Sequence, residues 1–511
     1  YLEIYPEKRE YLLYDDTDYL YYSSCASVLP REERYVQTEN GVREFIFLRE
    51  KSDENTENWV HTDYGKGEVY RSSLMTKLIL LCIVKFAALD MKGKGIEMEA
   101  GRPGWYDALN GLPSMFGSSM CETYELKRML LFVVENLKRY NRPVLLPEEL
   151  VRLLEEEKEA LNSFESKTAD KLDVWNRINI AKEAYRTATE KGIDGKQRKI
   201  EAEELADILS HFSFYLDDGI SQAVRENKGI PPAYCSYHMD GFEEKNGAIT
   251  FHNLTEWHMP DFLEGPVRFL KLPVSREVKK SVFEKVRNSD LYDKELKMYK
   301  INTSLEDQPQ DIGRARAFGR GWLENESIWL HMEYKYLLEL LKSGMYKEFF
   351  DALHTACVPF MDYRTYGRSL TENSSFIASS VNENKSLHGR GFVARLSGST
   401  AEFLDIWRRM FFGNHFVKEQ EGSVKCMFSP ALPEYLIPED GVVKARLFGS
   451  VDVVYHIYGK GDLIPGEYAV SNILVKFRED PEPRHLKELD SSVYYSIRAG
   501  KISEIRMDVL R

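Results

Sequence analysis

The spacing of apolar residues changes once along this 511-residue chain, and that change limits the folds the chain can adopt. Up to about residue 425 the apolar residues mostly recur at the spacing of buried or amphipathic helices. From Cys426 onward they alternate with polar residues, which is typical of half-buried β-strands. The pattern predicts a mainly α-helical domain over residues 1–425, dense enough in helices to suit an α/α barrel of helix pairs. A separate antiparallel β-domain is expected over residues 426–511.

The same patterns predict individual helices and strands. Residues 72–89 are apolar nearly all round, which indicates a buried helix. Ser119 and Glu122 have the spacing of a capping box, and their helix should reach about Tyr140. Residues 1–70 should be irregular, with short strands or one helix, and residues 231–272 should be strands and loops. Further helices are expected at 147–163, 169–191, 200–226, 276–288, 325–343, 346–357 and 400–412, and strands at 442–448, 451–458, 469–477, 493–497 and 502–509.

Composition excludes some classes of protein. The formal net charge of −13 argues against a nucleic-acid surface, which needs a basic face. The six cysteines are scattered, without metal-binding spacing, so a reduced, cytoplasmic protein without a metal site is expected. The most apolar run is too short and too charged to span a membrane. The chain begins with Tyr1 rather than Met, which leads us to expect a piece of a longer protein.

A connector rich in Gly and Pro, residues 101–113, is the first candidate site. Gly and Pro break regular structure, so the connector should be a loop of specified geometry that carries Trp105, Tyr106 and Asp107. An acid beside aromatic rings suits a sugar-cleaving site, because the rings offer a stacking surface and can raise the pKa of the carboxyl group. A structural turn capped by Asp107 explains the same residues equally well.

Three later stretches could also carry chemistry. Residues 313–321 place three Arg among three Gly, which suits either an anion cradle or a basic surface loop. His331 lies among large apolar residues of a helix expected to begin near Asn325, where a satisfied core histidine is the commoner case. Residues 387–400 combine small and hydroxyl residues just before a helix, which suits an anion site or an ordinary helix cap.

Three motifs in these stretches resemble a known family. Residues 105–110 read Trp-Tyr-Asp-Ala-Leu-Asn, residues 324–331 read Glu-Asn-Glu-Ser-Ile-Trp-Leu-His, and residues 395–400 read Arg-Leu-Ser-Gly-Ser-Thr. In their order and separation they resemble motifs of the inverting disaccharide phosphorylases of the cellobiose and chitobiose phosphorylase type, and look closest to β-1,3-glucan phosphorylases. Tyr106 stands where the family usually has Asn. The resemblance covers about residues 70–140 and 315–460, and residues 145–310 are expected to be an insertion.

The resemblance implies a fold and a set of roles. The fold would be an α/α toroidal barrel, incomplete at its N-terminus because the family's large N-terminal β-sandwich is missing, followed by a β-domain. Asp107 would be the general acid, and His331, Ser397 and Gly398 would bind phosphate. The residues implied to contact the sugar are Trp105, Tyr106, Asn110, Glu324 and Arg395.

The implied reaction is phosphorolysis of a β-linked gluco-disaccharide or oligosaccharide, or its reversal. Phosphate is already an anionic nucleophile, so this reaction needs one protein carboxyl, whereas an inverting hydrolase needs a second to activate water. No cofactor is expected beyond phosphate as co-substrate, and no nucleic-acid or membrane partner. The expected assembly is a homodimer, or a complex with a partner that supplies the missing N-terminal region.

Two other functions fit the same residues. An inverting glycoside hydrolase would combine Asp107 with a second carboxylate such as Glu324 or Asp362. A subunit that has lost its N-terminal half would bind glycans or act as a scaffold without catalysis.

Overall fold

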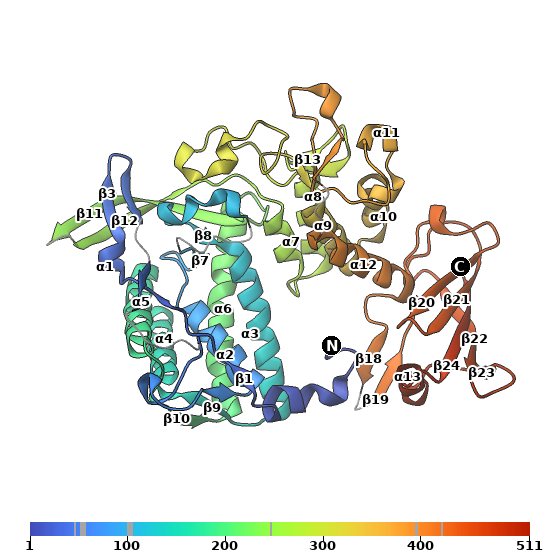
Figure 1. The fold of residues 1–511 in the computed structure, drawn as a ribbon, viewed down its shortest axis with the longest axis horizontal. Coiled ribbons are helices and arrows are strands. Elements are labelled where there is room, and N and C mark those ends of the chain that lie inside the picture. The colour runs from blue at the N-terminus through green and yellow to red at the C-terminus, as the bar shows by residue number, and fades with distance from the viewer. Residues whose placement is uncertain (45–47, 52–57, 100–105, 246–247, 394–396, 421–422) are drawn as a thin grey trace.

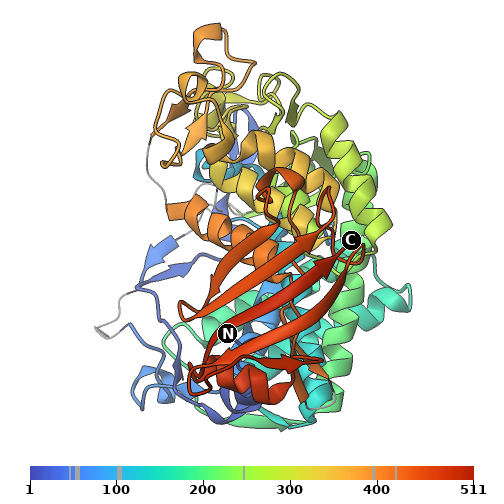
Figure 2. The ribbon, with the colours of Figure 1, turned by 90° about the vertical axis from the view of Figure 1, so that its right-hand side faces the viewer.

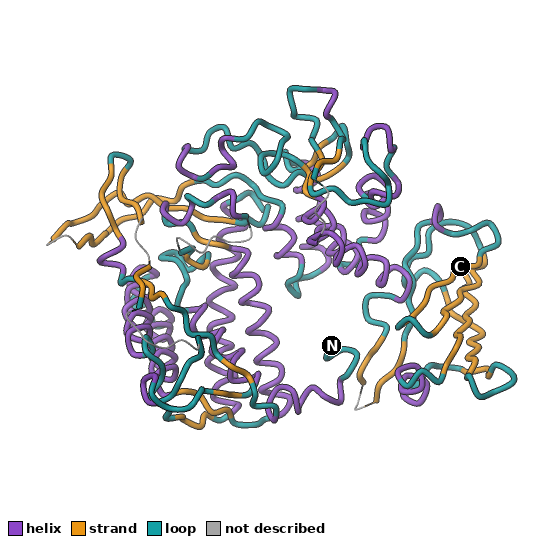
Figure 3. Tube along the Cα trace, in the orientation of Figure 1, coloured by secondary structure: helices purple, strands orange, loops and turns teal. Residues whose placement is uncertain are grey.

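The computed structural model describes the chain except residues 45–47, 52–57, 100–105, 246–247, 394–396 and 421–422. It is a mixed α/β protein with 42% helix and 24% strand, so the prediction of a mainly α-helical protein underestimated the strands. Helices, short strands and loops precede a C-terminal five-stranded sheet (Figure 3). No closed barrel of helix pairs is recognised in the part of the chain that the structure describes.

One group of helices is built around the long pair α3 (Met120–Tyr140) and α6 (Ala202–Glu226), which lie side by side in Figure 1. The side chain of Ser119 accepts a hydrogen bond from the Glu122 backbone N–H at 3.3 Å, as expected of a helix cap. Leu126, Leu130 and Val133 form a buried stripe along α3. Around this pair lie α2 (Leu74–Phe86), α4 (Glu148–Glu165) and α5 (Lys171–Ala188).

A second group of helices contains the predicted His331 segment. Helix α9 (Leu330–Lys342) contacts α7 (Glu264–Leu270), α10 (Tyr346–Ala356) and α12 (Ser397–Phe412), while α7 also contacts α3. The expectation that α9 begins near Asn325 was wrong. Residues Ile328–Trp329 instead form strand β15, which pairs with β16 (Phe376–Ile377), so the helix starts at Leu330. The remaining helices here are α8 (Arg276–Asn288) and the short α11 (Tyr363–Tyr366).

Short strands surround the helices. The largest of these sheets has the order β12-β11-β8-β7, and its two long strands form the hairpin at one edge of Figure 1. The N-terminal region has short strands and one four-residue helix, α1 (Arg31–Arg34), as expected for residues 1–70. The strands outside the C-terminal sheet are β1 (Tyr19–Leu20), β2 (Ala26–Val28), β3 (Tyr35–Thr38), β4 (Gly41–Glu44), β5 (Leu48–Glu50), β6 (Arg71–Ser72), β7 (Ile96–Glu97), β8 (Ser118–Ser119), β9 (Val144–Pro147), β10 (Gln197–Ile200), β11 (Tyr234–Lys245), β12 (Ala248–Trp257), β13 (Tyr292–Asp293), β14 (Met298–Tyr299), β17 (Gly391–Phe392), β18 (Val417–Gln420) and β19 (Ser423–Cys426).

The C-terminal sheet faces the viewer in Figure 2 and has the order β20-β21-β24-β22-β23. Strands β21 and β24 run parallel, so the sheet is mixed and the prediction of an antiparallel domain was wrong. The strand expected at 493–497 is helix α13 (Ser491–Arg498), capped by Asp490, with Val493, Tyr494 and Ile497 buried. The strands are β20 (Val442–Leu447), β21 (Val451–Tyr458), β22 (Ala469–Phe477), β23 (Arg484–Leu486) and β24 (Ile502–Leu510).

Within the described ranges, every helix is too short or too polar to cross a lipid bilayer.

Candidate active site

The loop that carries Asp107 is fixed against a second loop about two hundred residues later. The Gly111 backbone N–H donates to the Ile312 carbonyl at 3.1 Å, and the Arg314 N–H donates to Asn110 Oδ1 at 3.4 Å. Gly313 has a φ of 139°, and a Cβ there would come within 2.4 Å of the Ala108 carbonyl oxygen. This close approach therefore requires glycine at position 313.

This contact places Arg314 between two carboxylates. Its Nη2 atom lies 2.8 Å from Asp107 Oδ1 and 3.9 Å from Glu324 Oε1. Because the same Arg314 nitrogen makes both contacts, the distance from Asp107 Oδ1 to Glu324 Oε1 cannot exceed the sum of the two contact distances. The structure thus brings the proposed acid, the arginine of the Gly-rich loop and Glu324 into one site.

The two carboxylates differ in their environment. The Asp107 side chain is 60% exposed, whereas the Glu324 side chain is only 17% exposed. Burial, and to a lesser extent the nearby Asp107 charge, raise the pKa of Glu324, while Arg314 opposes this shift. The acidic pair is therefore asymmetric, with one open carboxylate and one largely shielded from water.

Buried hydrogen bonds of Tyr106 and Asn302 support the site from the protein interior. Tyr106 is 4% exposed, and its hydroxyl donates to the Glu324 carbonyl oxygen. The Asn302 amide donates both to this hydroxyl, at 3.1 Å, and to the same carbonyl, at 3.0 Å. Tyr106, predicted to contact sugar, is thus buried and connects the acid loop to the segment of Glu324, while Asn110 is exposed and pairs with Arg314.

Sequence reasoning did not find Asn302 or the ionic cluster beside it. Glu326 is 1% exposed and accepts hydrogen bonds from Lys300 at 2.7 Å and from Arg320 at 2.5 Å. Asn302 Oδ1 also accepts from the Glu326 backbone N–H at 2.6 Å. In the sequence, these residues could have been noticed only as charged and amide side chains within stretches that are otherwise apolar.

His331 is the second residue of α9, in its first turn rather than its second. Burial, followed by the positive charges of Lys335 and Arg268, lowers its pKa from 6.5 to about 4. The imidazole is therefore neutral near pH 7.

Helices α9 and α12 run parallel. Near their starts, the rings of Tyr334 and Phe403 are 6.0 Å apart, and Lys335 Nζ lies 3.6 Å from Glu402 Oε1. Near their ends, the Asn414 amide donates to the Leu341 carbonyl at 3.2 Å. The first turns of both helices therefore lie at one end, with His331 on α9 and residues 397–398 on α12.

A cavity of about 560 Å³ opens between α2, α3 and α7, and Arg268 is part of its wall. Arg268 donates to Glu264 at 3.0 Å and to Glu125 at 2.8 Å. The cavity also has an apolar wall that includes Leu126, Met129 and Phe132. Its mixed lining suits a ligand with both apolar and hydroxyl-bearing surfaces.

Several predicted residues are not part of this geometry. Trp105 and Arg395 lie outside the described residues, and of Ser397 and Gly398 the structure describes only the helical backbone. Asp362, the alternative second carboxylate, caps the short helix α11 and accepts from the Arg364 N–H at 3.1 Å. Among the described residues, no group of His, Cys, Asp and Glu is arranged to hold a metal ion.

The sequence matches no protein-family model, and a search of curated proteins finds no similar one.

Proposed function

We propose that this protein is an inverting glycoside phosphorylase. Its substrate would be a β-linked gluco-disaccharide or oligosaccharide, which phosphate would cleave to α-glucose 1-phosphate and a shortened acceptor. Asp107 would protonate the glycosidic oxygen as the bond breaks. Phosphate, held near His331 and the start of α12, would attack the anomeric carbon from the opposite face.

The observation that carries the proposal is the parallel arrangement of α9 and α12. Two helix N-termini at one end combine their partial positive charges, which favours an anion. A neutral His331 can donate a hydrogen bond there, and Lys335 and Arg268 add positive charge nearby. These features support a bound phosphate as the nucleophile.

Arg314 adds a condition to this mechanism. A guanidinium that hydrogen-bonds a carboxylate pairs with its ionised form, whereas a general acid must carry a proton. Substrate binding would therefore have to draw Arg314 away from Asp107. The exposure of both side chains, 49% for Arg314 and 60% for Asp107, leaves room for this movement.

The proposal includes an α/α barrel fold. Packing of α3 on α6, α4 on α5 and α9 on α10 and α12 is the part of the fold that supports helix pairing.

An inverting hydrolase is the second candidate, because Asp107 and Glu324 share Arg314. In such an enzyme one carboxyl protonates the leaving oxygen while the other activates water across a separation of about 6.5–9.5 Å. The raised pKa of Glu324 would suit it to the acid role, with Asp107 as the base.

One assay separates these functions. The purified chain is incubated with β-1,3- and β-1,4-linked gluco-oligosaccharides, with and without phosphate, and the products are resolved by anion-exchange chromatography. Glucose 1-phosphate that forms only when phosphate is present supports the phosphorylase. Free reducing sugar formed equally without phosphate supports the hydrolase, and no product in either arm contradicts both.

A further inference from the structure

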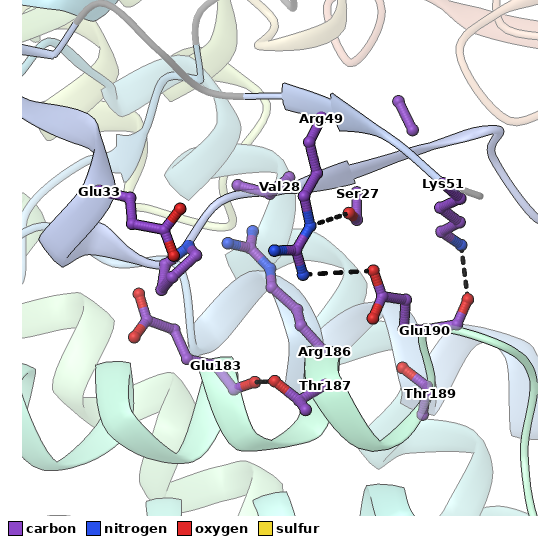
Figure 4. A pocket seen from close by; sticks show the side chains of 12 residues that line it. Ser27, Val28, Glu33, Arg49, Lys51, Glu183, Arg186, Thr187, Thr189 and Glu190 are labelled. Atoms are coloured by element: carbon purple, nitrogen blue, oxygen red, sulfur yellow. Dashed lines mark hydrogen bonds and ion pairs between the residues drawn. The ribbon is translucent and has the colours of Figure 1, made fainter.

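A second cavity is lined by residues from 26–51 and 183–190, which are separate in the sequence from the candidate active site residues. It has a volume of about 390 Å³ and is formed between the β2–β5 strand pair and the last turns of α5 (Figure 4). None of its lining residues belongs to the acid loop, to α9 or to α12. Its walls are mostly charged or hydroxyl-bearing side chains, so it differs from an apolar docking groove.

Three basic side chains line this cavity. Arg49 from β5 and Arg186 from α5 point into it from opposite walls, and Lys51 lies further along (Figure 4). Among the described residues, Arg49 makes only long contacts, 3.3 Å from Nε to Ser27 Oγ and 3.5 Å from Nη2 to Glu190 Oε1. Lys51 Nζ donates to the Glu190 backbone carbonyl at 2.7 Å.

Arg186 is only partly satisfied by protein groups. Its Nη2 pairs with Glu99, but its Nη1 is buried and has no hydrogen-bond partner among the described residues. This unpaired donor costs free energy in the folded chain. Two guanidinium groups in one cavity also repel each other, and a phosphate oxygen placed between them would reverse that repulsion.

The rest of the lining offers acceptors and hydroxyl groups. The carboxylates of Glu33 and Glu183 lie at one end of the cavity in Figure 4, and Ser27 and Thr189 supply hydroxyls. Glu33 makes no ion pair within the described part of the chain, and Glu183 accepts from the Arg31 backbone N–H at 2.8 Å. Carboxylates beside an anion site repel a second anionic group but accept hydrogen bonds from neutral hydroxyls.

We propose that this cavity binds a phosphomonoester of a small polyol, such as a hexose phosphate. The phosphate contacts Arg49, Arg186 and Lys51, and the hydroxyl groups contact the carboxylate end. The site is separate from the proposed catalytic reaction and does not depend on it. A phosphomonoester carries about −1.5 to −2 charges near neutral pH, and it would meet the three basic side chains of the lining at the end away from Glu33 and Glu183.

The test is isothermal titration calorimetry of the full chain with glucose 6-phosphate, and with inorganic phosphate and glucose as separate probes. Binding of glucose 6-phosphate is expected to weaken about tenfold to hundredfold in Arg49→Gln and in Arg186→Gln, since each loses a charge-assisted hydrogen bond. The matched control is Arg446→Gln, which removes an exposed arginine paired with Asp452 in the C-terminal sheet and should bind normally. Binding that His331→Gln weakens and Arg49→Gln does not is assigned to the proposed catalytic phosphate site, which separates the two sites.

Thermal unfolding of each variant checks that the fold is retained. Arg49→Gln decides the test if Arg186→Gln fails to fold, because the Arg49 side chain is 53% exposed. Absence of glucose 6-phosphate binding to the unmodified chain overturns the proposal, as does binding that Arg49→Gln leaves unchanged. Inorganic phosphate binding that Arg49→Gln weakens, and that is as tight as glucose 6-phosphate binding, would overturn the polyol part.

Discussion

At the scale of single residues, Arg314 is the side chain on which the candidate active site depends. It connects Asp107 to Glu324, and its own backbone N–H is fixed by Asn110. Gly313 makes this placement possible, because any Cβ there would collide with the acid loop. Any catalytic role of Asp107 is therefore coupled to the position of Arg314.

Asp107→Asn is expected to lower phosphorolysis by about 10²–10⁴-fold, the usual contribution of a general acid. The variant should fold normally because the Asp107 side chain is 60% exposed. Initial rates of glucose 1-phosphate formation and circular dichroism check both points. Asp311→Asn is the matched control, since Asp311 is also exposed, lies in the adjoining loop and pairs with Arg43 at 3.3 Å. Retained turnover in Asp107→Asn would remove Asp107 from the mechanism.

The lowered pKa of His331 predicts how the free energy of unfolding depends on pH. Its pKa is about 4 in the folded protein and near 6.5 when unfolded, so the unfolded chain binds more protons between these values. Stability should therefore fall as the pH drops through this window, and His331→Gln should lose less stability there. Urea midpoints measured at pH 7 and pH 5 check the prediction. Equal pH dependence in both proteins would show that His331 titrates normally.

At the scale of elements, helix α4 carries an unusual buried group. The Glu157 side chain is fully buried, and neither carboxylate oxygen has a hydrogen-bond partner among the described residues. Burial raises its pKa well above the usual value. The folded chain thus holds a proton that the unfolded chain releases, and this costs more stability as the pH rises above about 4.3.

Glu157→Leu should stabilise the protein by about 1–3 kcal/mol, the typical cost of an unsatisfied buried polar group. The gain should be larger at pH 8 than near pH 4, because rising pH destabilises only the protein that contains Glu157. Urea unfolding at both pH values measures it. Glu165→Leu, an exposed position near the end of α4, should give no comparable gain. Destabilisation by Glu157→Leu would indicate that the carboxyl group is satisfied in the protein.

At the scale of the whole molecule, the first residues of the chain contact its C-terminal domain. The Tyr494 hydroxyl donates to the Ile4 carbonyl, and Arg498 Nη2 lies 2.8 Å from Glu7 Oε1. The Arg498 guanidinium also lies 4.0 Å from the centre of the Tyr5 ring. These contacts tie the N-terminal segment to helix α13, across almost the full length of the sequence.

A double-mutant cycle of Glu7→Gln and Arg498→Gln should give a coupling energy of about 0.2–1 kcal/mol, the range for partly exposed ion pairs. The coupling should shrink at high salt because such pairs are screened. Urea unfolding of the four proteins provides the measurement. A coupling near zero at low salt would mean that this ion pair does not help to hold the N-terminal segment on α13.

The sequence determined the elements that local patterns specify. The helix at 276–288 and the strands at 451–458 and 469–477 were predicted with the bounds that the structure has, because their periodicity and turns are local. Asp107, Arg314 and Glu324 were each selected from their own loops. Their contact could not be predicted, because it depends on two loops packing about two hundred residues apart.

Only the tertiary structure decided the cases where distant contacts compete with local preference. Residues 493–497 alternate like a strand but form a helix, because Asp490 caps it and its buried face packs beside strand β19. Residues 328–329 pair with another strand, so α9 starts later and His331 lies at its N-terminus. Glu157 stands in a run of charged residues and is nevertheless buried. In each case the partner surface lies elsewhere in the sequence, and local spacing carries no information about it.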